Sequence, residues 1–210
     1  MQISATLVTD GTSDAVLKSI LEWLFREHLP ANTIITLTIA ALDRLPQPPR
    51  KNVDRFRTAW RLYPANVLFV HHDAENAAYE ARSAQIDREM MEAFPQLPPY
   101  VKIIPVWMTE AWLLGDEVAI REAANNPWGR EPLALPPKSR VETVDAKKVL
   151  FAALEKASGL SARRLKSFSV HRQRHRLAEL ALERGFGHLR GLNSFDKLEA
   201  ELVALLPTLN

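Results

Sequence analysis

Cysteine is absent from the 210-residue chain, so neither a disulfide framework nor a cysteine-based zinc site is available to it. This absence agrees with a reducing compartment. The first ten residues lack the basic start and apolar run of a signal peptide. No apolar run approaches the roughly 18 residues that a membrane span needs. We therefore expect a cytoplasmic protein with no membrane partner.

Several nucleotide-binding and hydrolase motifs are also missing. The sequence has no Gly-x-x-x-x-Gly-Lys-Ser/Thr phosphate loop, and no Gly-x-Gly-x-x-Gly follows its first apolar run. It also has no His-Glu-x-x-His zinc motif and no Gly-x-Ser-x-Gly elbow. These absences argue against a phosphate-loop ATPase, a dinucleotide-binding protein, a zinc protease of that type and an α/β-type serine hydrolase.

Apolar runs alternate with amphipathic segments over residues 1–125. This alternation predicts an α/β fold with a mainly parallel, Rossmann-like sheet of at least four strands flanked by helices. Pro105, in the fourth predicted strand, has no N–H to donate and favours an irregular or edge strand. The predicted strands are residues 3–9, 33–40, 66–70 and 101–108, and the main predicted helices between them are 52–62 and 76–94.

The last part of the chain has no predicted strand. Residues 126–144 contain four prolines and are predicted to be a linker or long loop. Residues 145–210 are predicted to be a basic helical extension packed on the core, and Ser194 is predicted to cap its last helix. The chain thus divides into an α/β domain (1–125), the linker and the extension.

The net charge of +2 conceals an uneven distribution of charge. Residues 1–125 carry 12 Lys and Arg against 16 Asp and Glu, whereas residues 126–210 carry 15 against 9. A metal site beside a surface that binds a polyanion would give this pattern, and so would ordinary uneven surface charge.

Acidic residues follow the predicted strands. Because the carboxyl ends of parallel strands lie along one edge, where ligands bind, we expect these carboxylates to converge. Carboxylates that cluster repel one another unless a cation neutralises them, and oxygen ligands suit Mg²⁺ or Mn²⁺. The candidate catalytic and metal-binding residues are Asp10, Asp73, Glu75 and Glu110, with Asp14 and His71 as further candidate ligands.

Some of these residues also have simpler interpretations. Asp14 or Ser13 can serve as a helix cap, and Glu110 can complement the dipole of a helix that it begins. His71 and His72 can be a hydrogen-bonded loop pair.

Three motifs together resemble the Toprim domains of topoisomerases, primases and nucleases of the overcoming-lysogenization-defect type. They are DGTSD at 10–14, FVHHDAE at 69–75 and TEAWLLGD at 109–116. More narrowly, they are similar to an uncharacterised bacterial Toprim-like family with acidic-Gly-x-x-Asp, His-x-Asp-x-acidic and Glu-Ala-Trp motifs. The resemblance covers about residues 1–120. It implies metal-dependent nuclease chemistry, in phage defence or DNA repair, with an ATPase partner.

The chain departs from the Toprim pattern at two positions. Asp10 stands where Toprim domains usually have Glu, and His71 stands where they usually have the first acid of Asp-x-Asp. Imidazole can bind Mn²⁺ but is a poor ligand for Mg²⁺. Either Glu75 and Glu110 complete the metal site, or the site has lost catalysis and keeps only a binding role.

A basic tract, defined here as residues 163–176, carries no acidic residue. Such a tract can neutralise phosphates and give salt-dependent binding to nucleic acid, and it can equally be a solvated helix. Its candidate nucleic-acid-binding residues are Arg163, Arg164, Lys166, Arg172, Arg174 and Arg176.

The leading hypothesis is therefore a Mg²⁺- or Mn²⁺-dependent phosphodiesterase acting on nucleic acid, with DNA favoured over RNA. The alternative is a non-catalytic Toprim-like module that binds nucleic acid or an ATPase partner. A third class is an enzyme acting on small phosphate esters.

Overall fold

The computed structural model describes residues 1–9, 14–74, 77–106 and 109–209. Its centre is a four-stranded sheet in which all strands are parallel, in the order β2-β1-β3-β4. This sheet, flanked by helices, confirms the predicted α/β fold class. The strands are β1 (Gln2–Val8), β2 (Ile34–Ile39), β3 (Val67–His71) and β4 (Tyr100–Ile103).

β4 lies at the edge of the sheet, one of the two arrangements that Pro105 favoured. It ends at Ile103 and is therefore shorter than the expected segment 101–108. β3 is buried along its whole length, which suits its apolar sequence and its place in the middle of a sheet covered on both faces. The apolar side chains of β1 and β3 point alternately into two clusters, one on each face of the sheet.

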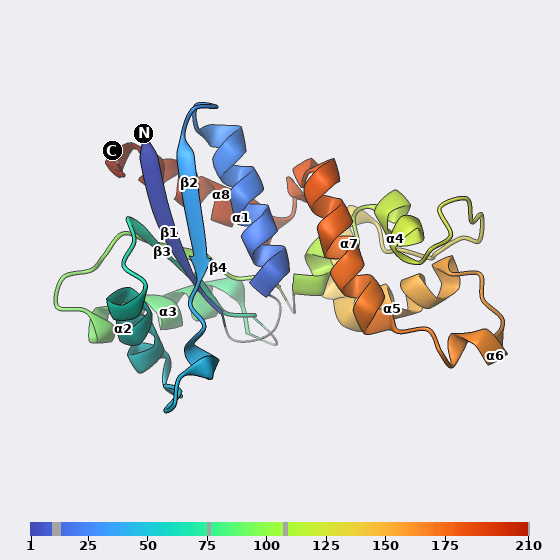
Figure 1. Ribbon diagram of the computed structural model, residues 1–210, viewed down its shortest axis with the longest axis horizontal. Helices are drawn as coiled ribbons and strands as arrows, with labels where there is room; N and C mark the ends of the chain where they lie inside the picture. The colour runs from blue at the N-terminus through green and yellow to red at the C-terminus, as the bar shows by residue number, and fades with distance from the viewer. Residues whose placement is uncertain (10–13, 75–76, 107–108, 210) are drawn as a thin grey trace.

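Helices cover both faces of the sheet (Figure 1). α2 (Asn52–Leu62) and α3 (Tyr79–Ala93) pack on one face, while α1 (Asp14–His28) and α8 (Asn193–Leu205) contribute to the cluster on the other. One apolar face of α1 is buried in the cluster that α8 shares, namely Val16, Leu17, Ile20, Leu21 and Leu24.

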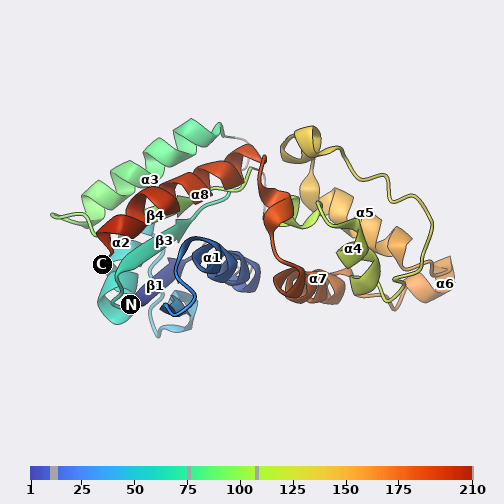
Figure 2. The ribbon, with the colours of Figure 1, turned by 90° about the horizontal axis from the view of Figure 1, so that it is seen from above.

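Residues 109–192 form a helical lobe beside the carboxyl ends of the strands (Figures 1 and 2). The lobe contains α4 (Glu117–Ala123), α5 (Ala146–Ala157), α6 (Ala162–Leu165) and α7 (Val170–Arg184). It also contains the 3₁₀ helices η2 (Thr109–Leu113), η3 (Lys138–Thr143) and η4 (Gly187–Leu189). The remaining 3₁₀ helices are η1 (Leu42–Arg44), after β2, and η5 (Leu206–Thr208), after α8.

Elements on both sides of residue 125 share one apolar core. α4 contacts α5 and α7, and α8 returns to contact β4. The proline-rich segment 126–144 contributes Leu133 and Val141 to the same cluster, so part of it is buried rather than free linker.

The predicted cap of α8 was wrong. The helix begins at Asn193, so Ser194 lies inside it, and the Ser194 hydroxyl accepts a hydrogen bond from Nε1 of Trp112 at 3.1 Å. The carboxylate of Glu142, in η3, accepts from the backbone N–H groups of Asn193 and Ser194 at 3.0 Å each. A side chain from another element therefore does the capping, which local sequence could not indicate.

In the part of the chain that the structure describes, no helix is long and apolar enough to cross a bilayer.

Candidate functional site

The order of the strands creates a topological switch point between β1 and β3. The chain passes from β1 to β2 on one side and then returns to place β3 on the other side. Val8 of β1 pairs with Val70 of β3, so the two strands end side by side. In open parallel sheets ligands bind outside the carboxyl ends at such a point. The loops that follow β1 and β3 are those in which the sequence predicted acidic ligands.

Asp73 is held at this edge by the backbone on either side of it. The N–H of His72 donates to the carbonyl of Ile103 at 3.1 Å, and the N–H of Ala74 donates to the carbonyl of Pro105 at 2.9 Å. The Asp73 side chain retains 29% exposure, so its carboxylate can still meet solvent or a ligand.

His71 belongs to the same group of side chains. Its Nε2 atom lies 3.2 Å from Oδ1 of Asp73, while its side chain is only 2% exposed. The other ring nitrogen, Nδ1, is buried without a hydrogen-bond partner among the described residues. A buried imidazole beside a carboxylate can orient that carboxylate or exchange a proton with it.

Asp10 and Glu75 lie outside the described residues, and so does the side chain of Asp14, the first residue of α1. Within the described ranges, no group of three or more His, Asp or Glu side chains is placed to hold a metal ion. Of the predicted carboxylate ligands whose side chains the structure describes, Asp73 alone is accessible and without a cationic partner from another element, and a metal ion there would need Asp10 or Glu75 as well.

Glu110 is committed to another partner. It lies in η2 with its side chain 7% exposed, and its Oε1 atom is 2.9 Å from Nε of Arg174, whose side chain is 8% exposed. Arg174 comes from α7, so this buried ion pair joins a predicted metal ligand to a predicted phosphate ligand. A guanidinium neutralises the Glu110 carboxylate, and a metal ion would have to compete with it.

The basic tract divides into residues that face solvent and residues that do not. Arg172 is exposed near the start of α7, whereas Arg174 is buried and Arg176 donates to the side-chain carbonyl of Asn125. Three more cations are exposed: Arg163 and Arg164 in α6, and Lys166 directly after it. Burial and pairing therefore leave four of the six cations facing solvent.

Arg55, a residue that the sequence analysis missed, binds the backbone just after the end of β1. Its Nη2 atom donates to the carbonyl of Thr9 at 2.7 Å, and its Nη1 atom donates to Asp43 at 3.1 Å. The neighbouring Phe56 packs edge-on against His72, with ring centroids 6.0 Å apart. No local pattern distinguishes Arg55 from the other cations of α2; only its place beside β1 does.

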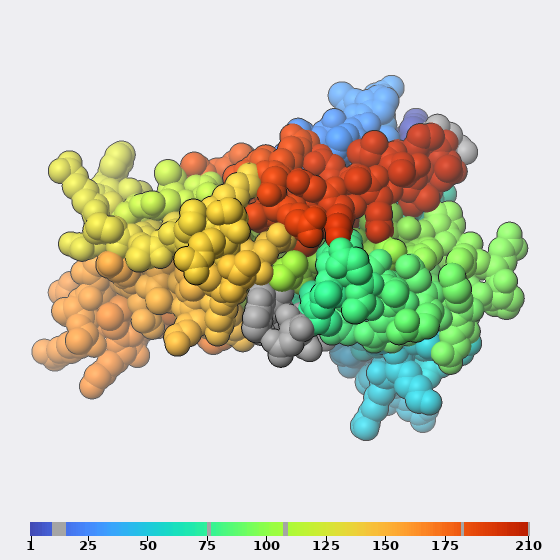
Figure 3. Space-filling view, turned by 180° about the vertical axis from the view of Figure 1, so that it is seen from behind, coloured from blue at the N-terminus to red at the C-terminus, as the bar shows by residue number. Residues whose placement is uncertain are grey.

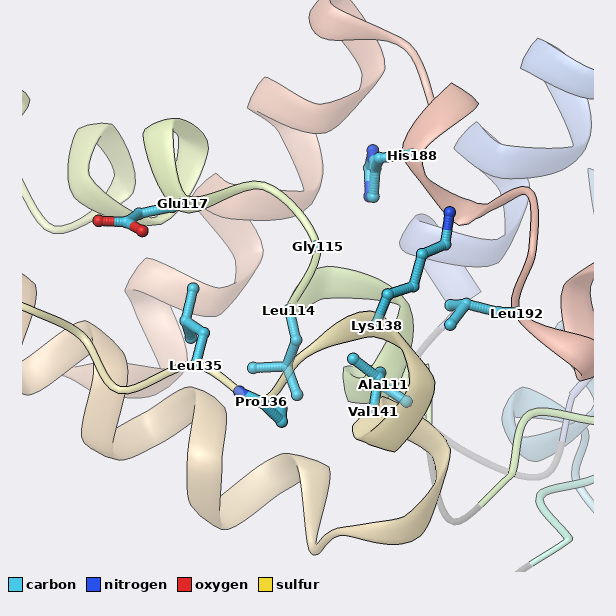
Figure 4. A pocket seen from close by; sticks show the side chains of 10 residues that line it. All are labelled: Ala111, Leu114, Gly115, Glu117, Leu135, Pro136, Lys138, Val141, His188 and Leu192. Carbon is cyan, nitrogen blue, oxygen red and sulfur yellow. The ribbon is translucent and has the colours of Figure 1, made fainter.

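A concavity of about 360 Å³ lies in the helical lobe (Figure 4). Its wall is apolar, with residues such as Leu114, Leu135 and Val141, and the polar side chains of Lys138, Glu117 and His188 stand at its rim. A Cβ atom at Gly115 would lie 2.5 Å from Cδ2 of His188, so glycine allows the ring to pack on the backbone there.

Burial lowers the pKa of His188. The nearby charges of Lys138 and Arg184 act in the same direction, while a hydrogen bond to the carbonyl of Trp112 and the charge of Asp116 oppose them. The neutral imidazole is therefore favoured in the folded protein.

No family model, curated protein or solved structure matches this chain.

Proposed function

We propose that the chain is a Mg²⁺- or Mn²⁺-dependent phosphodiesterase acting on nucleic acid, with DNA as the favoured substrate. The observation that supports this most is the position of Asp73. It lies at the carboxyl end of β3, beside the end of β1, where parallel sheets bind ligands.

The donor atoms at this edge fit a hard cation in part. Asp73 supplies an accessible carboxylate with a histidine beside it, and Asp10 and Glu75 would complete an oxygen-rich set. Such an ion would lower the pKa of bound water and offset the charge that develops on a phosphodiester. Asp73 would orient the reacting group, and His71 would fix the orientation of the Asp73 carboxylate.

The exposed cations at α6, at the end of the lobe away from the sheet, would hold a part of the nucleic acid that extends beyond the Asp73 edge. Arg174 has a different role in this proposal. By holding Glu110, it joins η2, the first element of the helical lobe, to α7 within that lobe.

The same ion pair favours the second candidate, a non-catalytic module that binds nucleic acid or an ATPase partner. With Glu110 neutralised by Arg174, fewer carboxylates are available to a metal ion. The two candidates differ in whether metal-dependent cleavage of DNA occurs.

The test is calorimetric titration of Mn²⁺ together with cleavage of plasmid and single-stranded DNA. Asp73→Ala should weaken Mn²⁺ binding at least about tenfold and abolish cleavage. The control is Asp54→Ala, because Asp54 is about half exposed on α2 and forms only a surface pair with Arg57. Asp43 is unsuitable, because it contacts Arg55 and through it the end of β1.

Equal Mn²⁺ affinity for wild type, Asp73→Ala and Asp54→Ala would overturn the metal site. Mn²⁺ binding at Asp73 without cleavage of either DNA would support the binding module instead.

A further inference from the structure

Trp128 stands out on the surface of the helical lobe. It is 89% exposed, more than any other large apolar side chain among the described residues. A single exposed apolar residue is common and carries no conclusion alone. The loop that carries Trp128 and the charges around it give this residue its significance.

The loop is fixed on both sides of Trp128 rather than loosely attached. The side chain of Asn126 donates to the carbonyl of Ala157, at the end of α5, at 2.8 Å. The N–H of Gly129 donates to the carbonyl of Asn126 at 3.0 Å. A Cβ atom at Gly129 would lie 2.5 Å from Nδ2 of Asn126, so a side chain there would displace the amide that holds the loop to α5.

The start of the loop is fixed to the basic helix α7. Asn125 has a positive φ of 61°, a conformation that asparagine adopts more readily than most residues. Its side-chain carbonyl accepts a hydrogen bond from Arg176. The backbone that carries Trp128 is thus held in a defined place, so a ligand would bear little further cost for ordering the loop.

The loop lies at the same end of the lobe as α6, the end farthest from the sheet (Figures 1, 2 and 3). In Figure 3 the yellow-green loop and the orange segment around α6 form this end together. Five exposed cations belong to these segments and to the end of α5, against the exposed acids Glu131 and Glu155. The cations are Arg130, Lys156, Arg163, Arg164 and Lys166.

We propose that this end of the lobe binds single-stranded nucleic acid, with one base stacked on Trp128 and the flanking phosphates on the cations of α6. An exposed aromatic ring beside cations is the combination that single-strand-binding proteins use. In a duplex each base is already stacked on both faces, so an indole could not reach one without unstacking it. The proposal deepens the proposed function in its nucleic-acid part and does not depend on cleavage.

The test is binding of a labelled oligothymidylate and of a labelled duplex at about 50 mM salt, followed by fluorescence anisotropy. Trp128→Ala should weaken binding of the single strand about 5- to 150-fold, the range expected for loss of one stacked base. Binding of the duplex, which contacts only the cations, should change less than twofold. Trp128→Phe should recover part of the affinity for the single strand.

The control variant is Met91→Ala, which removes another exposed apolar side chain, on α3 of the sheet layer, and should leave both affinities unchanged. Oligothymidylate should also quench tryptophan emission in wild type and quench it far less in Trp128→Phe. Thermal unfolding of each variant should match wild type, because Trp128 is almost fully exposed.

Equal binding of the single strand by wild type and Trp128→Ala would overturn the inference, as would equal losses for single strand and duplex. Absence of oligonucleotide binding by wild type would overturn it as well. If Asp73→Ala leaves Mn²⁺ affinity unchanged while Trp128 still governs binding of the single strand, the metal-dependent function fails and this inference stands.

Discussion

Glu110 and Arg174 illustrate how one pair of residues changes the interpretation of two sequence features. The sequence predicted Glu110 as a metal ligand and Arg174 as a phosphate ligand, whereas the structure pairs them with each other below the surface. Removing one member of a buried pair leaves an uncompensated charge, while removing both can be nearly neutral.

Arg174→Met should therefore lower the free energy of unfolding by about 3–5 kcal/mol, and Glu110→Gln combined with Arg174→Met should recover much of that loss. Chemical denaturation of the two variants and wild type measures both effects. Arg172→Met, at an exposed position on the same helix, should stay within about 0.5 kcal/mol of wild type. A double variant no more stable than the single variant would contradict the pairing.

His188 gives a second prediction at the residue scale. Its folded-state pKa lies below the unfolded value of about 6.5, so the unfolded chain binds the proton more readily. The stability contributed by neutral His188 is complete above that pH and is lost as the pH falls below it. Between pH 7.5 and 5.5, the melting temperature of wild type should therefore fall more than that of His188→Asn. Parallel pH profiles for the two proteins would show that His188 does not titrate in this way.

At the scale of elements, helix α6 and helix α7 separate what the sequence showed as one basic tract. The helical period of α7 turns Arg174 toward η2 and leaves Arg172 in solvent, while all three cations in and beside α6 are exposed. The electrostatic contribution to binding should therefore lie mainly at α6.

Replacing Arg163, Arg164 and Lys166 together with Ala should flatten the dependence of log affinity for single-stranded DNA on log salt. The expected change is about 0.7 unit for each phosphate that the variant no longer neutralises. Mn²⁺ affinity should not change, because the carboxylate site lies on the sheet edge. The control removes the same charge from exposed sites of the sheet layer, by changing Lys51, Arg61 and Arg88 to Ala. A similar flattening in both triple variants would mean that net charge, and not the α6 surface, governs binding.

At the scale of the whole molecule, the last helix joins the two parts. α8 follows the helical lobe but packs on the sheet, where the carboxylate of Glu201 accepts from the N–H of Lys102 on the open edge of β4 at 3.0 Å. Phe195, on the same helix, packs edge-on against Trp112 of η2, with centroids 5.7 Å apart. One apolar cluster therefore runs from the sheet into the lobe.

A shared core predicts one cooperative unfolding transition for the whole chain. Calorimetry should give a single peak, and far-ultraviolet circular dichroism and tryptophan fluorescence should report the same midpoint. Two resolved transitions would instead mean that the α/β domain and the helical extension unfold as separate units.

The sequence by itself determined the order of the strands and the helices between them and the parallel sheet, and it favoured an irregular or edge position for the fourth strand. Apolar periodicity, short buried runs and Pro105 are local signals, and each was confirmed within a few residues. The same signals placed Asp73 at the carboxyl end of β3, because parallel strands carry their loops to a known edge.

Only the tertiary structure decided which side chains meet across long stretches of chain. Glu110 with Arg174, Glu142 with the start of α8, and the Asn125 loop with α7 are all contacts between distant elements. Such contacts depend on the angles and distances at which helices pack, and hydrophobic periodicity specifies which face of a helix is buried but not which partner it meets.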